Sequence, residues 1–443
     1  MSLQLLVDDA LAQTPPGRVV WVALSGGLDS SLLLTLAADA CRRHPRPLHA
    51  LHVHHGLQAA ADGFEAHSRR LASRLGVPLF IERVTVDPMD SLGLEGAARE
   101  ARYTAFDRRV APGETLWLAQ HRDDQAETFL LAALRGSGVR GLAAMPHRRD
   151  RRGRRLERPL LGRLRAELEA EGSRLGLAWV EDPSNADTTL DRNFLRRTVM
   201  PLLESRWPRA GEALACSAAR AGEADALLEE LASLDLERLG GEAGRMPTAG
   251  LAELSSARRR LLIRHAAGCL GLPTPPARRL ESLLAQLGAR PDAEVRVAWP
   301  GAEARLWRGH LYLLAPVSSL PADWQGEWSG RPPLATPAGE VAVGLVRDDG
   351  MPVRLRVAPR RGGERLRLAG RGRRDLKRLL QELGLPPWAR ERLLVVHHAG
   401  EAVAVLEAGE GRWVAVAEGW LSEGPGSAGS RPPAGRRPPV RGR

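Results

Sequence analysis

One hexapeptide near the N-terminus limits the possible folds of this chain more than any other feature. Ser25-Gly26-Gly27-Leu28-Asp29-Ser30 follows the apolar run 19–24 and precedes the helix-like run 31–38. Adjacent glycines let backbone N–H groups turn inward without a Cβ in the way, and the start of a helix adds unpaired donors and a positive dipole end. This order of elements predicts a phosphate-binding loop. The alternative is an ordinary glycine-rich turn between a strand and a helix.

The acidic residue of this loop suggests which phosphate chemistry it serves. The loop lacks the lysine of the G-x-x-x-x-G-K-[ST] motif and carries Asp29 instead. Because Mg²⁺ is commonly held by one or two carboxylates and by phosphate oxygens, we expect Asp29 to bind Mg²⁺ beside a phosphate. The hexapeptide resembles the loop of the pyrophosphate-loop ATPases. That resemblance implies that ATP is cleaved between its α and β phosphates to give an adenylylated intermediate.

Composition and charge restrict the class of protein. A chain of 443 residues predicts two or three domains. A net charge of +11 favours a polyanionic partner such as nucleic acid. The three cysteines, Cys41, Cys216 and Cys269, lie far apart, which argues against zinc and against a disulfide framework. No signal peptide or membrane-length apolar run is visible, so we expect a soluble cytoplasmic protein without a membrane partner.

The first 205 residues predict an α/β domain. Apolar runs alternate with helical periodicity, which indicates a doubly wound, mostly parallel five-stranded sheet. The expected strands are 19–24, 48–53, 78–86, 115–120 and an edge element at 175–180, and the expected helices include 64–75, 96–110 and 125–134. Ligands of such sheets bind beyond the carboxyl ends of the strands. The hexapeptide and Asp123-Asp124 should therefore face one crevice.

The rest of the chain predicts smaller domains. Residues 206–315 are read as a helical domain, with helices at 209–239 and 255–270, and 316–337 as a linker. Residues 338–423 predict a small α+β domain, with strands at 353–357, 393–397, 402–406 and 414–417 around a basic helix at 373–383. The Gly-, Pro- and Arg-rich segment 424–443 predicts a disordered basic tail.

Three carboxylates gather where a helix is expected to begin. Asp123, Asp124 and Glu127 follow the fourth strand, and Asp124 and Glu127 share one helix face because they are three residues apart. Such a cluster could bind Mg²⁺ or a cationic substrate such as an amine. It could also simply cap the helix and complement its dipole.

Basic and histidine groups give weaker signals. Arg99 and Arg102 share a helix face, which is either a site or a solvated surface, and Arg192 follows a turn-rich loop suited to phosphate binding or to capping. His52 and His54 lie on one side of a strand, but no further ligand cluster accompanies them, which disfavours a metal site.

Together, these segments resemble one family, tRNA(Ile)-lysidine synthetase, a member of the pyrophosphate-loop superfamily with an adenine nucleotide alpha hydrolase-like fold. The hexapeptide alone is shared with asparagine, GMP and NAD synthetases, so the later stretches are the specific ones. The matching stretches are residues 25–30, 52–57, 98–103, 120–128, 135–138, 158–161, 181–185 with 191–193, and, in the second half, 361–365 and 377–388. Gln120 stands where many relatives have His or Ala, and the tail after Gly424 matches nothing in the family.

The resemblance implies a reaction and a set of roles. ATP adenylylates the wobble cytidine of an isoleucine tRNA with a CAU anticodon, and free lysine then displaces AMP to form lysidine. The implied roles are as follows: ATP binding by Ser25, Gly26, Gly27, Leu28, Asp29 and Ser30; metal binding by Asp29 and Asp123; catalysis by Asp29, Asp124 and Arg192; lysine binding by Asp124, Glu127 and Arg99; and tRNA binding by Arg374, Lys377 and Arg378.

Two alternatives remain open at this stage. A tRNA thiolase of the same ATPase fold would need a thiol to carry sulfur, and the sequence has no paired cysteines. A non-catalytic RNA-binding protein would explain the charge but not the acidic residues at one crevice. The sequence leaves both a monomer and a homodimer open.

Overall fold

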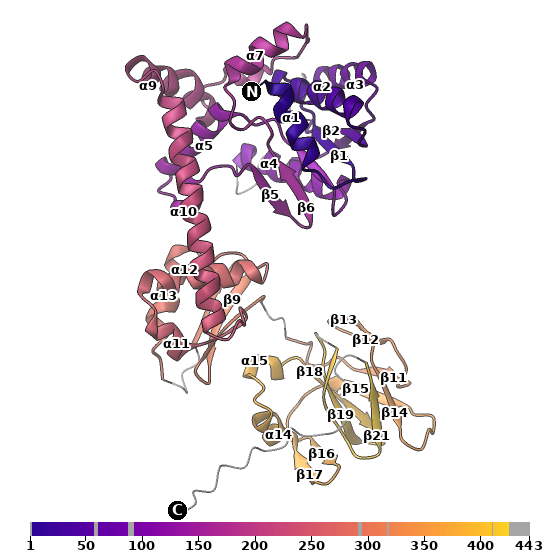
Figure 1. Cartoon of the computed structure of the whole chain (residues 1–443). Coiled ribbons are helices and arrows are strands. Elements are labelled where there is room, and N and C mark those ends of the chain that lie inside the picture. The colour runs from indigo at the N-terminus through magenta and orange to yellow at the C-terminus, as the bar shows by residue number, and fades with distance from the viewer. Residues whose placement is uncertain are drawn as a thin grey trace, which may run out of the picture. The chain divides into compact units, whose positions relative to one another are not determined.

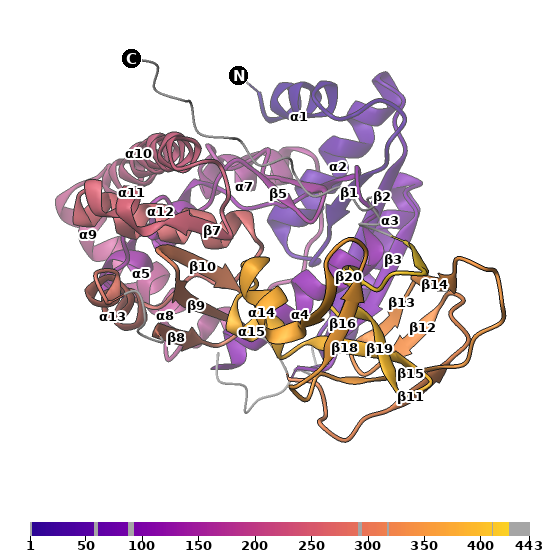
Figure 2. The same cartoon turned by 90° about the horizontal axis from the view of Figure 1, so that it is seen from below.

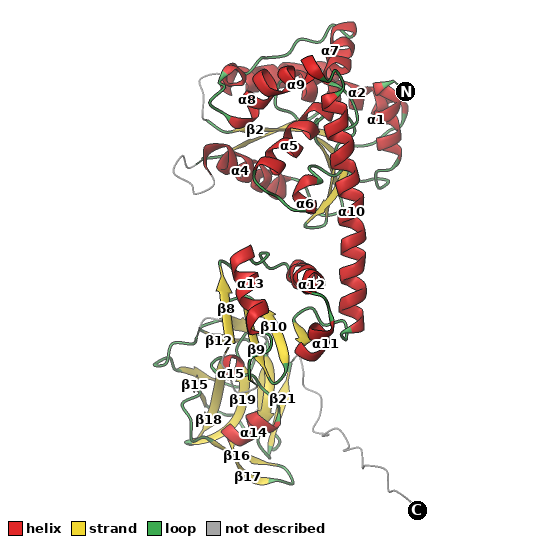
Figure 3. Cartoon of the chain, turned by 90° about the vertical axis from the view of Figure 1, so that its left-hand side faces the viewer, coloured by secondary structure: helices red, strands yellow, loops and turns green. Residues whose placement is uncertain are grey.

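The computed structural model describes residues 2–56, 61–86, 93–290, 295–316, 319–409 and 411–424. The chain forms two compact units, residues 1–231 and 232–443. The boundary falls within one long helix, α10 (Ala210–Arg238), which is seen along its length in Figure 3. Within the described ranges, no helix is long and apolar enough to cross a membrane.

The first unit is built on a six-stranded sheet in the order β3-β2-β1-β4-β6-β5. Its strands β1, β2, β5 and β6 are labelled in Figure 1. The pairs β1–β2, β2–β3, β1–β4 and β4–β6 are parallel, and β5 is antiparallel to β6. The strands are β1 (Val20–Ala23), β2 (Leu48–His54), β3 (Leu79–Arg83), β4 (Thr115–Trp117), β5 (Arg148–Arg151) and β6 (Arg154–Glu157). From β1 the chain continues to β2 on one side of the sheet, and from β4 it continues toward β5 and β6 on the other side. Ligands of such folds bind where the connections diverge in this way, beyond the carboxyl ends of the two strands.

Helices cover both faces of this sheet because alternate strand residues point to opposite faces. Val20 and Val22 pack with α1, α2 and α7, whereas Trp21 packs with α4 residues such as Phe106. The helices are α1 (Leu3–Ala12), α2 (Leu28–Arg43), α3 (Ala61–Leu75), α4 (Gly93–Arg109), α5 (Arg122–Leu134), α6 (Val139–Leu142), α7 (Arg165–Arg174), α8 (Asp191–Phe194) and α9 (Met200–Arg206), with a 3₁₀ turn at Pro183–Ala186.

The predicted parallel sheet is confirmed, but its fifth strand was misplaced. Residues 175–180 form no strand; Gly176 follows the end of α7 with a positive φ of 61°, and the chain then runs toward the phosphate loop. The fifth parallel strand is β6, preceded by the antiparallel β5, so the sheet has six strands. Both are rich in arginine and lack the apolar alternation by which strands are predicted.

A π-helical turn interrupts the helical segment 191–206. Leu195–Val199 form this turn between α8 and α9. Pro201 at the start of α9 cannot donate a backbone hydrogen bond to the preceding turn, which accounts for the irregularity. Such π turns are frequent at functional sites, and this one carries Arg196.

The second unit begins with the end of α10 and a mixed α/β body. Its helices are α11 (Thr248–Glu253), α12 (Ser256–Cys269) and α13 (Ala277–Gln286). They pack against a four-stranded sheet of β7 (Arg245–Pro247), β10 (His310–Leu314), β9 (Ala302–Trp307) and β8 (Val295–Trp299), visible in Figure 2. The region predicted as helical therefore contains a sheet as well as its helices. The alternating burial of Val295, Val297 and Trp299 was the available signal.

The C-terminal part of this unit is strand-rich, as expected. A five-stranded antiparallel sheet has the order β11-β15-β18-β19-β20. The strands are β11 (Gly326–Trp328), β12 (Leu334–Thr336), β13 (Gly339–Val341), β14 (Gly344–Arg347), β15 (Leu355–Pro359), β16 (Arg365–Leu368), β17 (Gly372–Asp375), β18 (Leu393–His398), β19 (Glu401–Glu407), β20 (Arg412–Val416) and β21 (Trp420–Glu423), with helices α14 (Leu376–Glu382) and α15 (Pro387–Arg390).

Two sequence-based expectations for this region need correction. The predicted linker 316–337 contains β11, which pairs with β15, and Trp328 of β11 is part of the core. The basic helix begins at Leu376 rather than at 373, because residues 372–375 form β17 and Asp375 caps the helix by accepting from Arg378 N. The predicted disordered tail after Gly424 lies outside the described residues.

Candidate active site

The phosphate loop connects the end of β1 to the start of α2. Gly26 has a φ of 93°, and a Cβ there would lie 3.2 Å from Phe64 Cδ1 and 3.3 Å from the Phe64 carbonyl oxygen. Any other residue at Gly26 would be strained and crowded. The hydroxyls of Ser25 and Ser30 are 2.9 Å apart, and Ser30 Oγ also accepts from Ser25 N at 3.1 Å. The loop is thus closed and held in shape by its own serines.

Asp29 lies in the first turn of α2 and has the properties of a cation ligand. Burial raises the pKa of its carboxyl group above the usual value, an effect that neighbouring cations only partly oppose. One oxygen, Oδ1, is buried and has no hydrogen-bond partner. A buried carboxylate oxygen without a donor fits a Mg²⁺ ion. Among the described residues, no group of three or more histidine, cysteine or carboxylate side chains is arranged to hold a metal ion.

His121, at the N-terminus of α5, joins three of the acidic residues. Its side chain is 1 % exposed. Its ring nitrogens lie 3.8 Å from Asp29 Oδ2, 3.3 Å from Asp123 Oδ2 and 3.6 Å from Asp124 Oδ2. Burial alone would lower the pKa of His121, but the three carboxylates outweigh it and raise that pKa.

Asp123 and Asp124 both have structural contacts at this helix start. Asp123 Oδ2 accepts from the backbone N–H of Arg165 at 2.9 Å and so ties α5 to the start of α7. Burial acts to raise the pKa of Asp123, yet the contacts with His121 and Arg165 lower it to about 2. Asp124 Oδ2 accepts from His121 N at 3.1 Å, which is the capping contact that the sequence left open.

Helix α5 also contributes to a four-residue ionic network. Glu127 is buried and accepts from Arg192 Nε at 2.9 Å and from Arg196 Nε at 2.6 Å. Arg196 also reaches Asp124 Oδ1 at 3.1 Å. Burial would lower the pKa of Arg196, but Glu127 and Asp124 raise it. Two carboxylates and two guanidinium groups therefore balance one another beside the phosphate loop.

A short segment connects this network to the phosphate loop. Val180 N donates to the carbonyl of Gly26 at 3.1 Å. Farther along, the buried amide of Asn193 donates to the carbonyls of Ser184 at 2.7 Å and Asp187 at 2.9 Å. Residues 180–193 thereby fix the helix that carries Arg192 relative to the loop that carries Asp29.

The structure brings most, but not all, of the predicted site residues together. Asp29, Asp123, Asp124, Glu127 and Arg192 are joined through His121 and Arg196. Arg99 is exposed and contacts Tyr103 within α4; among the described residues it has no contact with Asp124 or Glu127. Its predicted lysine-binding role has no support in this arrangement.

Sequence reasoning missed His121 and Arg196. His121 directly precedes the acidic pair, so its position was visible, but its burial among three carboxylates depends on α2 and α5 starting at the same edge of the sheet. Arg196 follows Arg192 by four residues, a spacing that puts both on one helix face. That spacing was the signal that could have found it.

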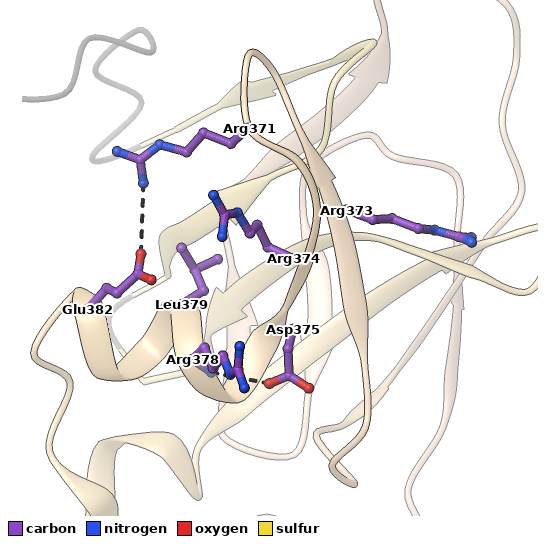
Figure 4. Close-up of a pocket in the computed structure, with 7 residues that line it drawn as sticks. All are labelled: Arg371, Arg373, Arg374, Asp375, Arg378, Leu379 and Glu382. Atoms are coloured by element: carbon purple, nitrogen blue, oxygen red, sulfur yellow. Dashed lines mark hydrogen bonds and ion pairs between the residues drawn. The ribbon is translucent and has the colours of Figure 1, made fainter.

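A second charged surface lies in the C-terminal unit, on β17 and α14. It encloses a cavity of about 120 Å³ lined by Arg371, Arg373, Arg374, Asp375, Arg378, Leu379 and Glu382 (Figure 4). Arg371 lies 3.9 Å from Glu382, and Arg373 pairs with Glu401. Within the described part of the chain, Arg374, Lys377 and Arg378 have exposed side chains and no acidic partner. Arg374 and Arg378 line the cavity, whereas Lys377 lies on α14 outside it.

Comparison with known proteins agrees with this layout. A family model described as a PP-loop domain matches residues 3–203. Models described as the TilS substrate binding domain and the TilS substrate C-terminal domain match residues 247–312 and 355–422. Among solved structures, U34-tRNA thiolase NcsA from Methanococcus maripaludis has a TM-score of 0.40 and 18 % identity over 49 % of this chain and 76 % of that one, too distant to bear on function.

Relatives of similar length carry one name. A tRNA(Ile)-lysidine synthase of Xanthomonas axonopodis is 44 % identical, with 93 % of each chain covered. One of Pseudomonas aeruginosa is 46 % identical over 87 % of this chain and 88 % of its own. One of Methylococcus capsulatus is 39 % identical over 93 % and 96 %. With the phosphate loop, the ionic network and three matching domains in one chain, the protein belongs to the tRNA(Ile)-lysidine synthase family.

Proposed function

We propose that this chain converts the wobble cytidine of a CAU-anticodon isoleucine tRNA to lysidine. The 2-keto oxygen of the base attacks the α phosphate of ATP and displaces pyrophosphate. The ε-amine of free lysine then attacks C2 of the base and loses a proton, and AMP leaves together with that oxygen. The change alters codon reading from AUG to AUA. The observation that carries the proposal is the convergence of the phosphate loop and the Asp124–Glu127–Arg192–Arg196 network at the carboxyl ends of β1 and β4.

The loop is proposed to hold the pyrophosphate of ATP. Backbone N–H groups of Gly26 and Leu28 lie at the start of α2, the Gly27 N–H donates to Ser25 Oγ at 3.4 Å, and the contacts between Ser25 and Ser30 hold the loop in shape around them. Asp29, with its unpartnered Oδ1, and Asp123 would hold Mg²⁺. When bound, Mg²⁺ neutralises the charge that develops on the phosphates. Arg192 is proposed to steady the adenylate.

The carboxylates of α5 are proposed to bind lysine. Arginine side chains already neutralise Asp124 and Glu127, so an incoming ammonium group must replace one of their contacts. The most exchangeable contact is Arg196 Nη2, since it is shared between Asp124 at 3.1 Å and Glu127 at 3.0 Å. The released guanidinium can then pair with the carboxylate of the amino acid. Asp124 is proposed to accept the proton that the amine must lose before attack.

The basic surface of β17 and α14 is proposed to bind tRNA. Arg374, Lys377 and Arg378 are exposed and lack acidic partners in the described structure, so phosphate groups can pair with them. We further propose a catalytic domain at 1–205, tRNA-binding domains at 206–315 and 338–423, and a cytoplasmic location.

The thiolase alternative is disfavoured by the cysteines. Cys41 lies in α2 and packs against the core, and burial raises its pKa to about 11, so its thiol is a poor nucleophile. Cys216 and Cys269 are exposed on α10 and α12, and these helices lie far from the phosphate loop along the chain.

Transfer of labelled lysine to tRNA tests the proposal. The protein is incubated with ATP, labelled lysine and the CAU-anticodon isoleucine tRNA, with a methionine elongator tRNA as control. Label should enter only the isoleucine tRNA and only with ATP. If no label enters, a parallel incubation with a sulfide donor in place of lysine separates the two alternatives: entry of sulfur would favour a thiolase, and binding of tRNA with no ATP-dependent product would favour a non-catalytic RNA-binding protein.

A further inference from the structure

One buried histidine of the first unit contacts the residue that leads into the phosphate loop and has no role in the proposed reaction. His52 lies in β2 and is 3 % exposed. Its Nδ1 is 2.8 Å from the carbonyl oxygen of Leu24, the residue that precedes Ser25. Because a carbonyl only accepts hydrogen bonds, Nδ1 must carry the proton and donate it.

This contact continues the sheet where its backbone ladder ends. The last backbone bond between β1 and β2 here runs from Leu24 N to the carbonyl of Leu51, at 2.9 Å. Beyond it the chain leaves the strand to form the loop, so the Leu24 carbonyl needs another donor. A buried carbonyl without one is costly. The His52 side chain supplies that donor from the neighbouring strand.

Helix α3 supports the same spot from a third side. Ser68 is fully buried, and its Oγ lies 3.5 Å from His52 Nδ1. The same Oγ lies 3.5 Å from the position that a Cβ on Gly26 would take, beside Phe64. The backbone at Leu24 and Gly26 is therefore supported by three residues, His52, Ser68 and Phe64. The charged and titratable groups around His52 are Glu65 on α3, His54 on β2 and Arg83 on β3.

We propose that His52 is a positioning residue for ATP: it fixes the backbone at the start of the phosphate loop so that the loop N–H groups meet the pyrophosphate. It does not touch the reacting atoms and acts through Leu24 and Gly26. This inference rests on the proposed function only for its enzymatic readout. The hydrogen bond from His52 Nδ1 to the Leu24 carbonyl does not depend on whether lysine is the second substrate.

Conservative variants separate positioning from general packing. The amide nitrogen of Asn lies at the same distance along the side chain as Nδ1, whereas that of Gln lies one bond farther out. We therefore expect His52→Asn to keep the bond and His52→Gln and His52→Leu to lose it. His49→Leu is the matched control, because His49 lies in the same strand but packs on Trp21 and Phe80, with ring centroids 4.8 and 5.1 Å away.

The experiment measures ATP use in lysine-independent adenylylation of tRNA, together with amide hydrogen exchange of the peptide covering 24–30. His52→Leu and His52→Gln should raise the KM for ATP by about 5- to 100-fold and speed exchange in that peptide. His52→Asn should stay within about threefold of the wild type, and His49→Leu should leave the KM unchanged. Tight tRNA binding and a cooperative melt identify folded variants.

Two results would overturn the inference: a folded His52→Leu with normal ATP kinetics and normal loop exchange, or a folded His52→Asn as impaired as His52→Leu. If the wild-type protein adenylylates no tRNA at all, the proposed function fails. The role of His52 is then decided by calorimetric titration of ATP into the same variants and by the exchange rates, with the same order expected.

Discussion

Replacing Glu127 by Gln tests the proposed lysine site most sharply, because the change keeps the shape of the side chain and removes its charge. Glu127 Oε1 accepts from Arg196 Nε at 2.6 Å, and Oε2 accepts from Arg192 Nε at 2.9 Å and from Arg196 Nη2 at 3.0 Å. A glutamine has one carbonyl oxygen, so one or two of these three bonds are lost, depending on which way its amide faces.

The size of the effect follows from these contacts. A hydrogen bond to a charged group contributes about 1.5–3 kcal/mol. Loss of a buried partner can cost about 3–5 kcal/mol, but Arg192 and Arg196 are each 30 % exposed and can regain water. We therefore expect a loss of about 1.5–3 kcal/mol in lysine use, which corresponds to a rise of about 10- to 150-fold in the KM for lysine.

Steady-state kinetics of lysine transfer, with ATP saturating, measures this rise. The KM for ATP in lysine-independent adenylylation should change by less than about threefold, since the phosphate loop is intact. Glu171→Gln is the matched control: it makes the same change in an ion pair with Arg174 on the surface of α7, and we expect normal lysine use. A folded Glu127→Gln with an unchanged KM for lysine would refute the assignment of this network to lysine.

Three further predictions address other parts of the account. Asp29→Ala should abolish lysine-independent adenylylation while tRNA binding persists, and adenylylation at the normal rate would contradict its role at the pyrophosphate. Replacing Arg374, Lys377 and Arg378 together by Ala should reduce the slope of log tRNA affinity against log salt by roughly 2–3 while ATP binding persists; an unaltered slope would move the tRNA contact elsewhere. Burial, with Arg102 nearby, lowers the pKa of His55 to about 4, so the unfolded state binds more protons below pH 6.5, and the free energy of unfolding should fall between pH 6.5 and 4. Denaturation at several pH values tests this, and a His55→Gln variant that keeps the full slope would exclude His55 as its source.

Sequence patterns predicted those parts of the fold in which one short run of residues determines the local structure. Val20–Ala23 is buried on both faces, so an unbroken apolar run indicated a central strand. The hairpin β5–β6 carries arginines that pair with Glu157 and Asp107. Because those charges are neutralised only by contacts that form in the folded chain, no local pattern marked it as a strand pair.

The same distinction holds for the candidate site. Asp29 was singled out as an acidic residue within a phosphate loop, and Asp124 and Glu127 as acidic residues at an expected helix start. Glu127 pairs with Arg192 and Arg196, which lie 65 and 69 positions farther along the chain, so only the folded structure shows that this carboxylate is already neutralised. The lysine-binding role of Arg99 stays a prediction: its helix places it beside Tyr103.

The most direct test of the central claim is nucleoside analysis of the tRNA by mass spectrometry. The CAU-anticodon isoleucine tRNA is incubated with the protein, ATP and lysine, then digested to nucleosides, beside a matched tRNA with uridine at the wobble position. We predict that one cytidine per tRNA is replaced by lysidine, only when ATP and lysine are both present, and that the uridine tRNA is unmodified. An unmodified wobble cytidine after incubation with active, tRNA-bound protein would contradict the account.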